Sequence, residues 1–365
     1  MKKKVISFLI VILIIFCGIL SVIIIFQHNL ISKLETSVLD SLDKEEKETK
    51  RIIIEKKKES QKEVFNQEDW NWESATLSAQ WSKRDAHTVS IFQDKMWLIG
   101  GVGGVAPDYS QNKSDIWSSK DGKDWTLIND KAVFGKERAH DAVVFQDKLW
   151  IFGGVKGNES YRNDIWNSED GVNWEEVETS NIWTPRKGHS AVVFDNKLWI
   201  LGGVDIYGAV NDVWVSEDGK AWQSATLKAP WSVRYDLTVA EFKGKMWLTG
   251  GVTPGLIGEK DVWTSINGKD WELVTDEAIW PGRHGHCLTV FQDNLWVIGG
   301  WNGNGKGYND VWFSENGKDW QKFEKESPWK GKEDLECVDY DNRLWVIGGM
   351  VSSGARTNDV WYLTK

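Results

Sequence analysis

The sequence predicts an all-β protein: a six-bladed β-propeller closed by an N-terminal strand and preceded by one transmembrane helix and a short helical stalk. Three observations lead to this prediction. A Gly-Gly pair that directly follows an apolar strand recurs six times at intervals of 48 to 53 residues, 25 tryptophans are present, and a long uncharged run follows the N-terminal lysines. Repeats of this length are typical of propeller blades. We therefore divide the chain into residues 1–29, a cytoplasmic tip and signal anchor, residues 30–66, a charged stalk or linker, and residues 67–365, the propeller.

The apolar run from Val5 to Phe26 has the length of a membrane-spanning helix. Its 22 residues carry no charge, and as a helix they would extend over about 33 Å, enough to cross a bilayer. A cleaved signal peptide is the alternative, but its apolar region is usually shorter and ends at a small-residue cleavage site, which is not found here. Three lysines precede the run and only Lys33 follows it closely. The positive-inside rule then predicts a single-pass protein of the cytoplasmic membrane, with its N-terminus inside and the propeller outside the cytoplasm.

The segment that follows the apolar run is expected to be a helical stalk. Leu30, Leu34, Val38 and Leu42 recur every four residues, which indicates a helix with one apolar stripe. The stripe fades after Leu42, so a stable coiled coil is only weakly indicated.

Each Gly-Gly pair lies within a unit that reads as four antiparallel strands. In the third copy, Asp195-Asn196 and Asp218-Gly219 form tight hairpin turns of the kind that tolerate a positive φ angle. The second strand is apolar on both faces, as expected of a strand buried between two layers. The four strands expected in this copy are residues 189–194, 198–203, 211–216 and 222–227.

The two ends of the repeat array complement each other. The sixth copy stops after its third strand, while residues 72–77, before the first copy, match the fourth strand at residues 222–227. The N-terminal segment can therefore close the ring. Tryptophan occupies repeat-invariant places on the second, third and fourth strands, where it is expected to fill the core between blades.

The Gly-Gly after an apolar strand, the later Trp and an Arg-x-x-His before the first strand, as in Arg186 to His189, resemble the kelch-repeat family. The resemblance covers residues 68–365 and implies the propeller fold. It says little about function, because kelch propellers serve in adhesion, scaffolding and sugar processing alike.

Charge and cysteine content narrow the possible partners. The net charge is −10 for the whole chain and −13 for residues 66–365, so we expect no nucleic-acid partner. Cys287 and Cys337 lie on equivalent strands of consecutive repeats but one position apart in register. A one-residue offset turns a strand side chain to the opposite face, so we expect two buried free thiols and no disulfide.

Strand direction places the loops that lead into first strands and the loops between second and third strands on one face, the long-loop face. Three positions, counted back from the aromatic residue that ends each first strand, form rings near the channel mouth. The basic ring, eight back, is Arg84, Glu137, Arg186, Arg234, Arg283 and Lys332. The histidine ring, five back, is His87, His140, His189, Leu237, His286 and Leu335. The tryptophan ring, eleven back, is Trp81, Phe134, Trp183, Trp231, Trp280 and Trp329.

These rings have a functional and a structural interpretation. Arginine forks and tryptophan faces could form an anion or carbohydrate pocket. A residue repeated in every blade could equally serve the structure of every blade, with arginine bound to loop carbonyls and tryptophan wedged between blades. Positions that break the repeat are better functional candidates, among them Asp236 and Asp334. The candidate ligand-binding residues are Arg84, Arg186, Arg234, Arg283, Asp236, Asp334, Tyr109, Tyr161, Tyr207 and Trp301.

Three functions remain open. The favoured one is a binding or scaffolding module for a protein or carbohydrate ligand at the long-loop face. The second is a sugar-active enzyme similar in outline to the kelch-fold sialic-acid mutarotase, with Asp236, Asp334 or Glu137 beside arginines in acid–base roles. The third is a structural envelope protein that oligomerises through its stalk. No catalytic set, metal site or cofactor motif is identified in the sequence, so we expect no cofactor.

Overall fold

The computed structural model describes residues 65–365 except residues 107, 136 and 158. The predicted transmembrane helix, and nearly all of the predicted stalk, lie outside the described residues. Among the described residues there is no helix with the length and apolar character needed to cross a membrane. The described chain opens with a short 3-10 helix, η1 (Gln67–Asp69), whose cap residue Asn66 accepts a hydrogen bond from the Glu68 N–H.

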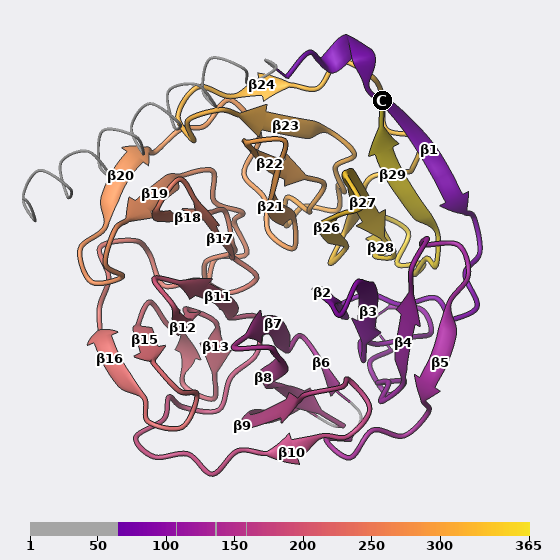
Figure 1. Ribbon diagram of the computed structural model, residues 1–365. Helices are drawn as coiled ribbons and strands as arrows, with labels where there is room; N and C mark the ends of the chain where they lie inside the picture. The colour runs from indigo at the N-terminus through magenta and orange to yellow at the C-terminus, as the bar shows by residue number, and fades with distance from the viewer. Residues whose placement is uncertain (1–64, 107, 136, 158) are drawn as a thin grey trace, which may run out of the picture. The chain divides into compact units, whose positions relative to one another are not determined.

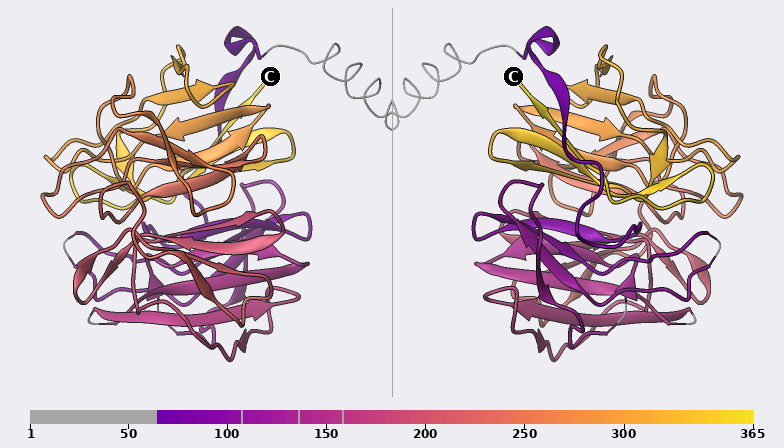
Figure 2. Two further views of the ribbon diagram at one scale, coloured as in Figure 1. Left: turned by 90° about the vertical axis from the view of Figure 1, so that its left-hand side faces the viewer. Right: turned by 90° about the vertical axis from the view of Figure 1, so that its right-hand side faces the viewer.

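Residues 66–365 form a single compact unit in which six antiparallel sheets surround a central axis (Figure 1). In the side views of Figure 2, the strands of each blade run between two opposite faces of the ring. The strands of each blade are given from the innermost outward. Blade one has β2 (Thr88–Phe92), β3 (Lys95–Ile99), β4 (Ile116–Ser119) and β5 (Thr126–Asn129), and blade two has β7 (Asp141–Phe145), β8 (Lys148–Lys156), β9 (Ser160–Ser168) and β10 (Glu175–Glu176). Blade three has β11 (Ser190–Phe194), β12 (Lys197–Leu201), β15 (Val213–Ser216) and β16 (Gln223–Thr226); blade four has β17 (Thr238–Phe242), β18 (Lys245–Thr249), β19 (Val262–Ser265) and β20 (Glu272–Thr275); and blade five has β21 (Cys287–Phe291), β22 (Asn294–Ile298), β23 (Val311–Ser314) and β24 (Gln321–Lys322).

The sixth blade is completed by the N-terminal segment, as the sequence predicts. It comprises β26 (Glu336–Tyr340), β27 (Arg343–Ile347), β29 (Val360–Thr364) and β1 (Asn71–Thr76). Strand β1 pairs antiparallel with β29, with Trp72 opposite Leu363. Because the first and last strands of the propeller share one sheet, opening the ring would require breaking this ladder.

Short extra strands decorate the long-loop face. They are β6 (Glu137–Arg138), which pairs with the extended β8, the hairpin of β13 (Val204–Asp205) with β14 (Gly208–Ala209), and β25 (Lys332–Glu333), which pairs with β28 (Met350–Val351). The opposite face carries the two-residue turns. In the β11–β12 turn, Asp195 and Asn196 have φ angles of 50° and 54°, a conformation that Asp and Asn tolerate better than most residues.

The tryptophans of the second strands are buried, as predicted, and so is the tryptophan ring, which favours the structural interpretation of that ring. The whole tryptophan ring is at most 5% exposed. In each blade one member packs edge to face against the tryptophan of the fourth strand, as Trp183 does on Trp222 at 4.5 Å between ring centres. The other pairs are Trp81 with Trp125, Phe134 with Trp174, Trp231 with Trp271, Trp280 with Trp320 and Trp329 with Trp72. These rings wedge blades together and offer no stacking face to a ligand.

Each Gly-Gly pair joins its blade to the next one. The N–H of Gly251 donates to the carbonyl of Arg283 in the following blade at 3.0 Å, and equivalent bonds occur around the ring. Gly251 has a φ angle of 95°, and a Cβ there would press on the Tyr235 carbonyl and on Leu237. Only glycine fits both constraints, which explains the repeat at the level of backbone geometry.

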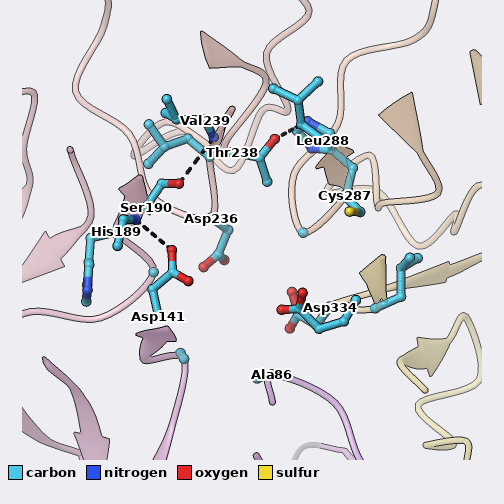
Figure 3. Close-up of a pocket in the computed structure, with 18 of the residues that line it drawn as sticks. Ala86, Asp141, His189, Ser190, Asp236, Thr238, Val239, Cys287, Leu288 and Asp334 are labelled. Carbon is cyan, nitrogen blue, oxygen red and sulfur yellow. Dashed lines mark hydrogen bonds between the residues drawn. The ribbon is translucent and has the colours of Figure 1, made fainter. Parts of the chain in front are cut away.

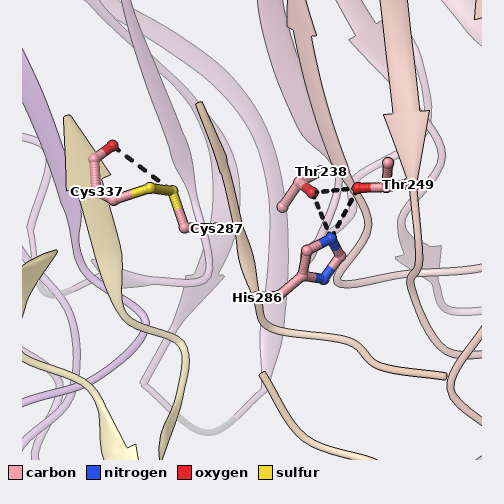
Figure 4. The surroundings of a disulfide bond; sticks show 5 residues. All are labelled: Thr238, Thr249, His286, Cys287 and Cys337. Atoms are coloured by element: carbon pink, nitrogen blue, oxygen red, sulfur yellow. Dashed lines mark hydrogen bonds between the residues drawn. A yellow bond between two sulfur atoms is a disulfide. The ribbon is translucent and has the colours of Figure 1, made fainter. Parts of the chain in front are cut away.

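The prediction of free thiols is wrong: Cys287 and Cys337 form a disulfide (Figure 4). Their Cα atoms are 5.9 Å apart, within the usual range for a disulfide. The opposite-face argument applies to residues on paired strands of one sheet. Strands β21 and β26 belong to different sheets that meet at the channel, so their side chains converge despite the offset in register.

Candidate functional site

Six residues in the left-handed backbone conformation encircle the axis where the chain enters each innermost strand. Their φ angles lie between 49° and 60°. Each N–H donates to the carbonyl of the equivalent residue in the preceding blade, at 2.7 to 3.3 Å, so that six hydrogen bonds close a circle. We call this circle the left-handed ring; its members are Ala86, Ala139, Gly188, Asp236, Gly285 and Asp334.

The left-handed ring separates two cavities. The mouth cavity, of about 560 Å³, opens on the long-loop face. The channel cavity, of about 200 Å³, lies on the other side of the ring among the innermost strands (Figure 3). Asp236 and Asp334 line both cavities, whereas Ala and Gly occupy the other four places in the ring.

The mouth cavity is lined by one residue from the same position of every blade, seven before the aromatic that ends the innermost strand. Unlike the basic, histidine and tryptophan rings, this position carries a different amino acid in each of the six blades. We call it the variable ring: Asp85, Arg138, Lys187, Tyr235, His284 and Glu333. The loops between second and third strands contribute Tyr109, Leu256 and Trp301 to the wall.

Four carboxyl groups of the mouth cavity have raised pKa values. Burial raises the pKa of Asp85 despite the opposing charge of Arg356. Burial raises the pKa of Asp236 to about 6. Burial, together with the charges of Asp236 and Asp85, raises the pKa of Glu333 to about 8. Burial raises the pKa of Asp334 well above its usual value, and the negative charges of Glu333, Asp236 and Asp85 raise it further. The cavity therefore holds several acids that cannot all ionise easily at neutral pH.

The channel cavity is polar and also acidic. Asp141 accepts hydrogen bonds from the N–H groups of Ala142 and Ala191, while burial raises its pKa to about 7. Burial and the charge of Asp141 raise the pKa of Glu336 well above its usual value. The four histidines of the histidine ring are buried, and burial lowers the pKa of His140 to about 4. These histidines lie against the Gly-Gly pair of the preceding blade, as His286 does against Gly250.

The four arginines of the basic ring do not reach either cavity. Arg234 is 1% exposed and forms two bonds to Asp261 at 2.5 and 2.7 Å, and a third to the Gly250 carbonyl at 2.8 Å. The same contacts repeat for Arg84 with Asp115, Arg186 with Asp212 and Arg283 with Asp310. Each of these guanidinium groups is bound to an aspartate of its own blade, which favours the structural interpretation of the ring.

Blade two builds the same junction with a cation from a different position, Lys156 on β8. Glu137 replaces the arginine, and Lys156 lies 3.1 Å from Glu137 and 3.0 Å from Asp164. Blade six uses Lys332, fully buried, against Asp359 at 3.1 Å. All six blades therefore place a cation beside the Asp that precedes the third-strand tryptophan.

The structure brings together four of the other predicted site residues. Asp236, Asp334, Tyr109 and Trp301 all line the mouth cavity. Tyr161 packs against the Lys187 ammonium group at 5.5 Å and lies outside the lining. Tyr207 projects from the β13–β14 hairpin with 87% of its surface exposed and also lies outside the cavity.

Sequence reasoning missed the variable ring. Each of its members directly follows a member of the basic ring, and the regular repeat of the basic ring drew attention away from this variable position. The available signal was the variation itself: six equivalent positions carry two acids, two cations, a tyrosine and a histidine. A position that every blade needs for folding would have stayed the same.

Neighbouring residues hold the site in place. A Cβ on Gly188 would collide with the Asp236 carboxylate, and one on Gly285 would collide with that of Asp334. Glycine in the preceding blade therefore makes room for each aspartate.

In the part of the chain that the structure describes, no group of three or more His, Cys, Asp or Glu side chains is placed to hold a metal ion.

Comparison with known proteins agrees with this architecture. Residues 103–300 match the family model described as the KLHDC2/KLHL20/DRC7 Kelch-repeats domain. A solved structure titled "Structure of YjhT" matches with a TM-score of 0.65 and 16% identity, over 79% of this chain and 96% of that chain. This second likeness concerns the fold alone. No curated protein matches the chain. Since the family model covers more than half of the sequence, the chain belongs to the kelch-repeat family of that description.

Proposed function

We propose that this kelch propeller is a binding module that holds a carbohydrate or protein ligand in the mouth cavity of its long-loop face. One observation carries the proposal: Asp236, Glu333 and Asp334 line this cavity, and in the described part of the chain no lysine or arginine lies within ion-pair distance of them. Buried charges without partners cost stability. A cost retained at the wall of a cavity, beside Trp301 and Tyr109, is typical of a recognition site.

The electrostatics change the expected ligand. The anion pocket predicted from the sequence would use the guanidinium groups of the basic ring, and these are already bound to aspartates. The carboxyl groups of the mouth cavity instead suit a ligand that donates hydrogen bonds or carries positive charge. Neutral sugars and protein segments both meet this condition.

A parallel screen on glycan and peptide arrays tests the proposal. The probe is the purified full chain, labelled, with a matched double variant Asp236→Asn/Asp334→Asn. Asparagine keeps the side-chain size and tolerates the φ angles near 50° at both positions. We expect selective binding that the double variant loses and that the variant Asp195→Asn, altered in a turn of the opposite face, retains. Equal binding by all three proteins would place the ligand elsewhere.

We further propose that the propeller is displayed outside the cytoplasm by the N-terminal apolar run. The three lysines before that run support this orientation. The Cys287–Cys337 disulfide supports it independently, because such bonds persist mainly in oxidising compartments. Labelling of intact cells with a membrane-impermeant amine reagent tests the proposal: lysines of the propeller should react without lysis, and protection of all of them until lysis would contradict it.

A sugar-active enzyme is a second candidate, favoured by one observation. Asp236 and Glu333 lie 3.8 and 3.9 Å from the same atom, His284 Nδ1, yet their pKa values are raised to different levels, about 6 and about 8. Two nearby carboxyl groups with separated pKa values can act as base and acid at neutral pH. An exchange measurement by NMR on anomers of N-acetylneuraminic acid and glucose tests this. Acceleration that Glu333→Gln abolishes would support the enzyme; rates equal to buffer would remove it.

A further inference from the structure

One side of the mouth cavity holds carboxyl groups with which no described cation forms an ion pair. Glu333 is only 8% exposed and lines the cavity, and its carboxyl group has no hydrogen-bond partner among the described residues. His284 Nδ1 is 3.9 Å from it, beyond hydrogen-bond distance. Because burial lowers the pKa of His284 to about 4, this imidazole is neutral at pH 7 and cannot balance the carboxylates.

The other charges around the mouth cavity form ion pairs, in which two cations share one carboxylate. Arg138 forms an ion pair with Glu159, and Lys187 Nζ lies 2.9 Å from the same carboxylate. Asp85 accepts a hydrogen bond from Arg356 Nε at 2.8 Å. The acids left without a cation at ion-pair distance are Asp236, Glu333 and Asp334; the charges of Lys187 and Arg138 lower the pKa of Asp236 but do not cancel the effect of its burial. A ligand with a positive group would relieve the repulsion among them, whereas an anion would add to it.

The rim of the mouth cavity is apolar and exposed. Val105, Leu256 and Ile257 lie at the tips of the long loops with 60%, 59% and 65% of their surfaces exposed. Leu256 itself lines the cavity, as does Ala106 beside Val105. Val105 lies on the β3–β4 loop of blade one, and Leu256 and Ile257 lie on the β18–β19 loop of blade four, so exposed aliphatic side chains are offered to a protein partner from two sides of the cavity. Sugars would instead be held by aromatic faces, and one such ring, Tyr109, is partly covered by the Arg138 guanidinium at 4.4 Å.

We infer that the mouth cavity accepts a lysine or arginine side chain from a protein partner, whose neighbouring apolar residues pack on Val105, Leu256 and Ile257. This inference rests on the proposed function and names the class of its ligand. The cationic group enters between Asp236, Glu333 and Asp334. The aliphatic part of the same side chain passes Trp301, in the manner of long charged side chains that bury their stems along apolar surface.

The test selects peptides from a random heptapeptide library on the immobilised full chain. We expect the bound pool to be enriched in Lys and Arg next to Leu, Ile, Val or Met. The most enriched sequence is then synthesised with a fluorescent label, together with a copy in which its basic residue is replaced by methionine. Loss of one charge-assisted contact in a buried site weakens binding about tenfold or more. Anisotropy titration should show this loss for the methionine peptide.

Protein variants complete the design. Glu333→Gln and Asp334→Asn should each weaken the labelled peptide about tenfold, while Asp195→Asn on the opposite face should bind within twofold of the wild type. Two variants are used so that misfolding of one, seen as a lowered melting temperature, still leaves a measurement. Raising the salt concentration should also weaken binding, but less than for a fully exposed ion pair.

Several results would overturn the inference. A selected pool without basic residues, or a peptide that binds both carboxyl variants as tightly as the wild type, would exclude a cationic side chain as the ligand. Binding of a glucosamine tetrasaccharide with no peptide selected would show that the cationic ligand is an amino sugar; the inference would fall and the proposed binding function would stand. If no ligand binds on either the peptide array or the glycan array, both the inference and the proposed binding function are wrong.

Discussion

Two rings of residues, adjacent in the sequence, have opposite roles in this propeller. The basic ring carries Arg or Lys in five of the six blades, is almost fully buried, and in those five blades pairs with the Asp that precedes the third-strand tryptophan. The variable ring follows it by one residue, differs in every blade and lines the mouth cavity. A step of one residue along an extended chain turns the side chain from the blade interior to the axis.

The comparison shows how to separate structure from function in a repeat protein. A contact needed by each blade must recur in each blade, so repetition marks residues that serve the fold. A ligand on the axis meets all blades at once and breaks their equivalence, so variation at an axial position marks residues that can serve recognition. Asp236 and Asp334 satisfy the second criterion within the left-handed ring, where Ala or Gly otherwise occurs.

The largest expected effect is the loss of a basic-ring arginine. Arg234→Met leaves Asp261 buried without its two charge-assisted bonds, and removal of one partner from a buried pair costs about 3–5 kcal/mol of unfolding free energy. Lys187→Met, at the variable-ring position, should cost less than about 1 kcal/mol because its ammonium group is partly exposed. Urea unfolding of both variants measures the difference. Similar losses of unfolding free energy in the two variants would contradict the assignment of a structural role to the basic ring and not to the variable ring.

The disulfide is expected to have the next largest effect. It links innermost strands of blades five and six across 50 residues of sequence. The variant Cys287→Ala/Cys337→Ala should lose about 2–4 kcal/mol, because the unfolded chain gains conformational freedom. Thermal unfolding with and without a reducing agent checks this: reductant should lower the melting temperature of the wild type and leave that of the variant unchanged. An unchanged wild type would mean that the backbone rings alone hold these blades together.

Glu333→Gln should change the pH dependence of stability. The pKa of Glu333 is raised from 4.5 to about 8 on folding, so the folded state keeps a proton that the unfolded state releases. Stability is then lost as the pH rises from about 4.5 to about 8. The variant should lack this part of the loss and be more stable than the wild type at pH 8. Parallel pH profiles of unfolding free energy would instead indicate that Glu333 is ionised freely in the folded state.

The smallest expected effect concerns Tyr207, which the sequence placed among the ligand-binding candidates. The side chain is 87% exposed and lies outside the mouth cavity. Tyr207→Ser should therefore change the unfolding free energy by less than about 0.5 kcal/mol. It should also leave the affinity for a mouth-cavity ligand within a factor of two, as measured by titration. A larger loss of affinity would extend the recognition surface to the β13–β14 hairpin.

The fold was predictable because its signals are local and repeated six times. The Gly-Gly pairs, the tight turns and the tryptophans each report on one blade, and the match between residues 72–77 and the fourth strands revealed the closure. The candidate site was predictable only in part. Asp236 and Asp334 were found because they interrupt a repeat, whereas the arginines were misplaced because a basic residue near a channel mouth looks the same in sequence whether it faces the axis or an internal aspartate.

The sequence by itself determined the number of blades, their strands, the closure by the N-terminal strand and the core role of tryptophan, since each follows from periodicity. Only the tertiary structure decided which residues meet at the axis. Asp236 and Glu333 are nearly a hundred residues apart and approach the same histidine because the ring closes. Cys287 and Cys337 join for a related reason: strands of separate sheets converge at the channel, and no register rule within one sheet describes that convergence.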